Sequence, residues 1–145
     1  MEVLLEPYNY LLSNPGKEIR TTLILAFEEW VPLAPSKREE IIEIIKMLHS
    51  ASLMIDDVED NSSLRRSKPV AHKIYGIPAT INCANYVYFL ALEKLTQIAD
   101  LEAINVFTQE LIQLHRGQGM EIYWRDSVKC PTEEEYIQMV QNSNF

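Results

Sequence analysis

The stretch that decides the fold is HSASLMIDDVEDNSSLRR, residues 49–66, in which an apolar run leads directly into the acidic residues 56–60. An α-helix has about 3.6 residues per turn, so Asp56 and Asp60 lie on one face and His49 precedes them on it. Unpaired carboxylates resist burial, and Mg²⁺ prefers oxygen ligands. This helix face therefore predicts a magnesium site with open positions for substrate oxygens.

Ser52 lies on the same helix face between the histidine and the acids, whereas Asp57 is rotated by about 100° and flanks this face. Taken alone, an acidic run at a helix end is more often a solvated surface than a metal site. The basic pair Arg65-Arg66 favours the site, because guanidinium groups match phosphate oxygens and Mg²⁺ bridges carboxylate to phosphate. The stretch therefore predicts a site for a diphosphate.

Composition limits the class of protein. The chain has 145 residues, 47% of them hydrophobic, and a formal net charge of -8. The length suggests one domain, the hydrophobic content argues against disorder, and the negative charge argues against nucleic-acid binding. No apolar run approaches membrane-spanning length, and from the pattern of the first twenty residues we expect no secretion signal. Cys83 and Cys130 are isolated, as in a reducing compartment, so we expect a cytoplasmic location.

Hydrophobic spacing predicts an all-α chain, because no alternation typical of strands is present. Helices are expected over residues 2–13, 17–30, 36–61, 79–98 and 101–125, with a last one after Thr132. The residues Ser36–Glu39 and Thr132–Glu135 are capping boxes, and Asp100 is a further N-cap. Helix 79–98 is apolar nearly all round, which predicts burial. Gly117 and Gly119 predict a close approach by another group.

Three further segments give local expectations. The stripe expected to be buried on helix 36–61 consists of Ile41, Ile44, Ile45, Leu48 and Ile55. Residues 62–69 are expected to form a polar, basic loop, followed by a short helical turn with a structural His72. Lys17 and Arg20 lie in the expected first turn of helix 17–30, where cations oppose the helix dipole. A bound anion explains them, although spacing alone favours ordinary surface charges.

Taken together, these stretches resemble the trans-prenyltransferases, the isoprenyl diphosphate synthases, and most of all the animal and fungal type of geranylgeranyl diphosphate synthase. The motifs that carry the resemblance are GKEIR (16–20), His49, DDVED (56–60), Arg65-Arg66, PVAHKIYGIPATINCANYVYFLALEK (69–94) and GQGMEIYWRD (117–126). The likeness extends to about Val140. DDxxD alone also occurs in terpene cyclases, but GKxxR and the arginine pair speak against a cyclase.

The resemblance implies the N-terminal half of the isoprenoid-synthase helical bundle and a role for each matching residue. The diphosphate of isopentenyl diphosphate would be held by Lys17, Arg20, His49 and Arg66. Arg65 would hold the allylic diphosphate (dimethylallyl, geranyl or farnesyl). Asp56 and Asp60 would bind Mg²⁺, with Asp57 in support. The implied reaction is Mg²⁺-dependent ionisation of the allylic diphosphate, attack by the isopentenyl double bond and loss of a proton.

The resemblance also implies a product length. Farnesyl-type members carry bulky aromatic residues at the position of Ala51, five residues before Asp56, where they cap the prenyl pocket. Ala51 and Ser52 are both small, which favours a geranylgeranyl-length product. Small residues also let two helices pack closely, so this alternative stays open.

The chain departs from the family in its second half. Family members are about twice this long, their second aspartate-rich motif has no counterpart here, Ser143-Asn144 replace their lysine-threonine pair, and Glu121 stands where many have Asp. We therefore expect a single partial polyprenyl-synthase domain over residues 1–145, truncated before the second motif. One hypothesis is a synthase-type enzyme. The alternative is a catalytically incomplete isoform that binds a full-length synthase through helices 79–125; both predict a homo-oligomer or hetero-oligomer.

Overall fold

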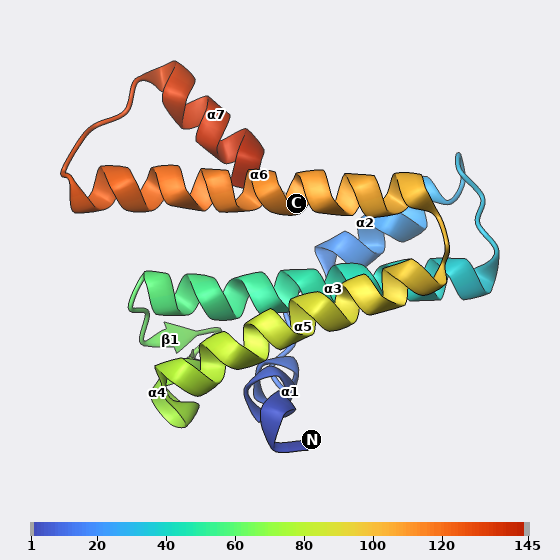
Figure 1. Ribbon diagram of the computed structural model, residues 1–145, viewed down its shortest axis with the longest axis horizontal. Helices are drawn as coiled ribbons and strands as arrows, with labels where there is room; N and C mark the ends of the chain where they lie inside the picture. Colours follow the sequence, from blue (N-terminus) through green and yellow to red (C-terminus); the bar gives the residue numbers. More distant parts are fainter. Residues whose placement is uncertain (1, 144–145) are drawn as a thin grey trace. The chain divides into compact units, whose positions relative to one another are not determined.

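The computed structural model describes residues 2–143, and helices form most of it (Figure 1). The predicted all-α class is confirmed. The chain divides into two compact units, Met1–Ala99 and Asp100–Phe145, which we describe separately. The first unit contains η1 (Glu2–Leu5), α1 (Glu6–Leu12), α2 (Ile19–Phe27), α3 (Pro35–Glu59), β1 (Leu64–Arg65), β2 (Lys68–Pro69), α4 (Ala71–Tyr75) and α5 (Ile77–Gln97). The second contains α6 (Leu101–Asp126) and α7 (Glu133–Ser143).

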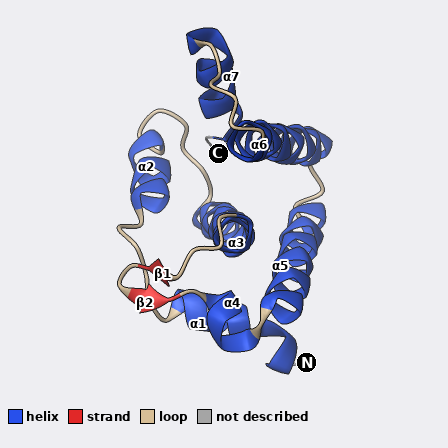
Figure 2. Cartoon of the chain, turned by 90° about the vertical axis from the view of Figure 1, so that its left-hand side faces the viewer, coloured by secondary structure: helices blue, strands red, loops and turns tan. Residues whose placement is uncertain are grey.

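The core of the first unit lies mainly between α3 and α5, and α2 runs along another side of α3 (Figure 2). The buried residues of α3 are Ile44, Met47, Leu48, Ser50, Ala51, Met54 and Asp57. Ala51 on α3, and Ala84 and Ala91 on α5, are 0% exposed. Alanines at these positions leave room for close helix contact, and burying each neighbouring Met or Leu contributes about 1.5–3 kcal/mol. The α3–α5 pair is thus the scaffold for the first unit.

Two predictions about burial need correction. On α3, Ile44 and Leu48 are buried, but Ile41, Ile45 and Ile55 are only partly so. The buried stripe is rotated toward Met47, Ala51 and Met54 because it faces α5. Helix α5 is not buried all round, since Phe89 is 69% exposed. Consecutive helical residues are about 100° apart, so Phe89 lies beside the buried Tyr88 rather than on the same face.

The helix starts show which of the predicted N-caps and capping boxes make their hydrogen bonds. At α6, Asp100 Oδ1 accepts hydrogen bonds from two backbone N–H groups, as predicted. The box at α7 is confirmed by bonds from Glu135 N to Thr132 Oγ1 (3.2 Å) and from Thr132 N to Glu135 Oε2 (2.8 Å). The box at Ser36 is wrong: Ala34 is the N-cap and makes no side-chain bond. The residue after it, Pro35, occupies the first turn, which its fixed φ favours.

The basic loop after α3 is a small antiparallel hairpin, β1 paired with β2. Its turn residues Arg66 (φ 53°) and Ser67 (φ 66°) both have left-handed backbone, as tight hairpins with a right-handed twist require. Sequence reasoning missed the hairpin because neither residue is Gly or Asn. Asn14 Nδ2 donates to the carbonyl oxygens of Arg65 (3.4 Å) and Arg66 (3.2 Å). The segment after α1 therefore fixes both arginines.

In the second unit, α7 packs on α6. A Cβ at Gly117 would lie 2.4 Å from Ser143 Oγ, whereas one at Gly119 would meet nothing within 4 Å. The predicted close approach is confirmed at Gly117 alone. No helix within residues 2–143 is long and apolar enough to cross a membrane. The part of the final helix expected at Asn144 and Phe145 lies outside the described residues.

Candidate functional site

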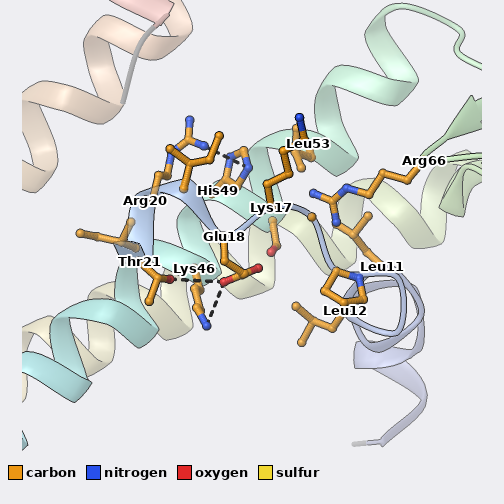
Figure 3. Close-up of a pocket in the computed structure, with 15 residues that line it drawn as sticks. Leu11, Leu12, Lys17, Glu18, Arg20, Thr21, Lys46, His49, Leu53 and Arg66 are labelled. Carbon is orange, nitrogen blue, oxygen red and sulfur yellow. Dashed lines mark hydrogen bonds and ion pairs between the residues drawn. The ribbon is translucent and has the colours of Figure 1, made fainter. Parts of the chain in front are cut away.

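A cavity of about 930 Å³ in the first unit is lined by residues of α1, the loop before α2, α2, α3 and the hairpin (Figure 3). All four residues predicted to hold one diphosphate line this cavity: Lys17, Arg20, His49 and Arg66. They come from three separate parts of the chain. Lys17 lies before α2, which begins only at Ile19, so the prediction that it belongs to the first helical turn is wrong. The structure nevertheless brings the four together.

Arg20 and His49 contact each other directly, with 3.2 Å between Arg20 Nη1 and His49 Nε2. A guanidinium group only donates, so this contact assigns His49 Nε2 as the acceptor of a neutral imidazole. Burial, followed by the charges of Arg20, Arg66 and Arg65, lowers the pKa of His49 to about 4. Arg20 Nε is buried and has no partner among the described residues. An unpaired buried donor beside a cavity indicates room for an anionic acceptor.

Lys46 and Glu18, two further residues of the cavity, compensate each other (Figure 3). Their side chains form an ion pair of 3.0 Å, and Thr21 Oγ1 also donates to Glu18. The bond from Lys46 is the main cause that lowers the pKa of Glu18. Glu18 is the N-cap of α2 with φ 51°. Sequence reasoning missed this pair, since it joins a loop residue to a helix residue without a spacing signal.

The position of the Arg66 side chain depends on a hydrogen bond to Asn14 and on the space beside Gly16. Arg66 Nη1 donates to the carbonyl oxygen of Asn14. A Cβ at Gly16 would lie only 2.7 Å from Arg66 Nη2. Glycine therefore leaves the space in which the guanidinium lies. Among the described residues, no carboxylate forms an ion pair with Lys17, Arg20 or Arg66.

The aspartates have a different environment. Arg65 donates from Nε to both oxygens of Asp57 (2.9 Å each) and from Nη2 to Asp56 Oδ2 (2.7 Å). Asp57 is 3% exposed, so it belongs to the buried side of α3 and does not simply flank the acidic face. Burial, and next the charge of Asp60, raise the pKa of Asp56 even though Arg65 opposes both. Asp60 is the exposed C-cap of α3.

The donor set of Asp56 and Asp60 fits Mg²⁺. Both supply carboxylate oxygens, and burial, followed by the nearby charge of Asp60, raises the pKa of Asp56. Within the described part of the chain, no three His, Cys, Asp or Glu side chains form a metal cage. Mg²⁺ commonly binds through one or two carboxylates plus water and substrate phosphates. Asp57 fits this role less well, because both its oxygens accept from Arg65.

The two residues predicted to set product length do not line the cavity. Ala51 is completely buried on the side of α3 that faces α5. Ser52 is partly buried, and its hydroxyl donates to the carbonyl oxygen of His49. This geometry is compatible with close helix packing at Ala51, and the role of both residues in product length stays a prediction.

The family model for polyprenyl synthetase matches residues 1–143. The chain therefore belongs to the polyprenyl synthetase family, as its motifs predict.

Several fungal relatives are geranylgeranyl pyrophosphate synthases. The one from Neocamarosporium betae is 55% identical over 97% of this chain and 41% of its own length. The one from Mucor circinelloides f. lusitanicus is 59% identical over 97% of this chain and 46% of its own. A third, from Metarhizium robertsii, is 52% identical over 97% of this chain and 42% of its own length. The chain spans less than half the length of these curated relatives.

Proposed function

We propose that this chain carries the diphosphate-binding part of a prenyltransferase that condenses isopentenyl diphosphate with an allylic diphosphate to give geranylgeranyl diphosphate. One observation carries the proposal: Lys17, Arg20, His49 and Arg66 converge on a single cavity, and the same helix α3 continues to Asp56. The names of the three fungal relatives support the product.

The cavity binds the diphosphate of isopentenyl diphosphate in this proposal. Lys17, Arg20 and Arg66 are basic, and none of them forms an ion pair with a carboxylate of residues 2–143. Guanidinium groups make short, charge-assisted bonds to phosphate oxygens. Neutral His49 adds a donor from Nδ1, because its Nε2 accepts from Arg20. The bound anion also supplies an acceptor for the buried Arg20 Nε.

The aspartate end binds the allylic diphosphate. Asp56 and Asp60 would hold Mg²⁺, which neutralises the charge that develops on the departing diphosphate. Arg65 adds a second positive charge at the same place. The allylic C–O bond breaks, the isopentenyl double bond forms the new C–C bond, and a proton leaves the resulting cation. Closing the site to water would protect that cation from hydrolysis.

Calorimetry with isopentenyl diphosphate tests the proposal directly. Wild type should bind it without Mg²⁺, and Arg20→Gln should weaken binding by about 10- to 100-fold, the effect of losing a charged hydrogen bond. Lys94→Gln is the matched control, since Lys94 is an equally charged residue that pairs with Glu43 outside the cavity. Equal loss in both variants would show general charge attraction and would contradict a specific site.

Product length needs the full catalytic context, for example these residues joined to an intact second half. Ala51→Phe should then shift the product toward farnesyl diphosphate and leave the Mg²⁺ dependence unchanged. Ala91→Phe is the matched control, because Ala91 is also 0% exposed in the same core and overpacking alone costs about 1–3 kcal/mol. If chromatography showed the same product length for wild type, Ala51→Phe and Ala91→Phe, the role of Ala51 in product length would be wrong.

A second function is binding to another synthase chain, and exposed apolar side chains favour it. In the first unit, Phe89 on α5 is 69% exposed; in the second unit, taken separately, Leu101 and Val106 on α6 are 83% and 54% exposed. Apolar surface of this kind often marks an interface when it is contiguous. Sedimentation should find a homo-oligomer, or a complex with a full-length synthase. A dilute, folded monomer that ignores the synthase would contradict this function.

A further inference from the structure

Arg65, Asp56 and Asp57 form a cluster, here called the arginine clamp, that the proposed function uses only in part. Arg65 Nε donates to both oxygens of Asp57 at 2.9 Å, and Nη2 lies 2.9 Å from Asp57 Oδ1 and 2.7 Å from Asp56 Oδ2. One guanidinium thus uses both oxygens of Asp57 but only one oxygen of Asp56.

The two carboxylates differ in burial. The Asp57 side chain is 4% exposed and the Asp56 side chain 36%. A buried carboxylate that loses its partner is strongly disfavoured, so Asp57 cannot release Arg65. Asp56 is reached by solvent, and Arg65 occupies only its Oδ2 oxygen. Asp56 is therefore the member of the clamp that can change partner.

On the basis of the proposed function, we propose that Asp57 is a positioning residue: it keeps Arg65 at the aspartate motif while Asp56 exchanges Arg65 for Mg²⁺. Asp57 itself then does not bind the cation. The Nη1 nitrogen of Arg65, which donates to no group within residues 2–143, becomes the donor for a diphosphate oxygen. The backbone supports this position, because Asn14 Nδ2 donates to the carbonyl oxygen of Arg65.

The proposal has a consequence that distinguishes positioning from metal binding. Without the Asp57 charge, Asp56 is the remaining anionic partner of Arg65 in the clamp. Arg65 then competes with Mg²⁺ for Asp56, and cation affinity falls although Asp57 never touches the cation. If Arg65 is also removed, no competitor remains and the effect of Asp57 disappears.

A double-mutant cycle tests this with magnesium pyrophosphate as the probe, measured by calorimetry on the 145-residue chain. Asp57→Asn should weaken binding by about tenfold or more. In the Arg65→Gln background the same change should alter affinity by less than about twofold, the usual error of additive sites. Asp57→Glu keeps a carboxylate for Arg65 and should restore part of the affinity. An equal loss in both backgrounds would mean that Asp57 binds the cation itself and would overturn the proposal.

A second measurement does not depend on affinity. The Arg65 Nε–H resonance should exchange slowly in wild type, persist after magnesium pyrophosphate is added, and be lost in Asp57→Asn, while circular dichroism confirms that each variant is folded. Loss of the resonance on adding the probe to wild type would overturn the proposal. If wild type does not bind magnesium pyrophosphate, the proposed function fails. The Arg65 Nε–H resonance then still tests whether Asp57 positions Arg65. An unchanged resonance in Asp57→Asn would show that it does not.

Discussion

The cavity and the aspartate motif share helix α3 but differ in how their charges are compensated. In the cavity, Lys17, Arg20 and Arg66 have no carboxylate partner among residues 2–143. At the motif, Arg65 already binds Asp56 and Asp57. In the proposed function, the cavity is therefore ready for an anion, whereas Asp56 would exchange Arg65 for the cation. The difference predicts that the first site binds diphosphate without metal and the second only with it.

The largest expected effect comes from a substitution that removes metal binding at the aspartate motif alone. Magnesium pyrophosphate at about 100 times its dissociation constant should stabilise wild type by about 2.7 kcal/mol. In a thermal melt, Asp56→Asn should lose the part of this shift that exceeds the shift given by metal-free pyrophosphate, because the cavity still binds the anion without metal. Without Mg²⁺ the same variant should be no less stable than wild type, because the folded state raises the pKa of Asp56 and thus disfavours its charge.

Glu39→Gln is the control for that experiment, since Glu39 is an exposed acid on the same helix. It should keep the full shift. The same loss in both variants would mean that the metal shift depends on overall negative charge and not on Asp56.

The next effect comes from a substitution that weakens anion binding in the cavity alone. Arg66→Gln should weaken metal-free pyrophosphate binding by about 10- to 100-fold, because it removes a charged donor from the cavity. Asp56→Asn should leave this metal-free binding nearly unchanged. Calorimetry in EDTA measures both, and equal losses would show that the two sites do not work separately.

A smaller effect tests whether the loop before α2 positions Arg66. Gly16→Ala places a methyl group about where Arg66 Nη2 lies, 2.7 Å away. The end of an arginine side chain can move, so stability should change little. Metal-free pyrophosphate affinity should fall by only a few fold, about 1 kcal/mol or less, which is less than for Arg66→Gln. An unchanged affinity would mean that the exact position of Arg66 does not matter for binding.

The last effect concerns pH. Folding lowers the pKa of His49 from 6.5 to about 4, so between these values the unfolded chain binds more protons than the folded one. The stability contributed by neutral His49 is complete above pH 6.5 and is lost progressively as the pH falls to about 4. In urea melts, His49→Gln should remove this part of the acid destabilisation. If the stability of His49→Gln fell with acid as steeply as that of wild type, neutral His49 would not be the cause.

Local signals predicted much of the fold. The long helices, the Asp100 cap and the Thr132 box follow from residues within one or two turns of each other, and the structure confirms them. The Ser36 box fails because Pro35 competes for the same helix start. The hairpin was missed, since its turn residues Arg66 and Ser67 do not favour positive φ by their own preference, and Arg66 is held by contacts with Asn14.

The sequence by itself determined the helical class, the register that lets Asp56 and Asp60 interact, and the set of basic residues that could hold a diphosphate. Helical spacing is a local property, so one segment suffices to read it. Only the tertiary structure decided that Arg66 meets the loop at Asn14, 52 positions away, and that Arg65 binds Asp57 before any ligand. Such pairings depend on which charges are buried together, and burial is set by the packing of the whole unit.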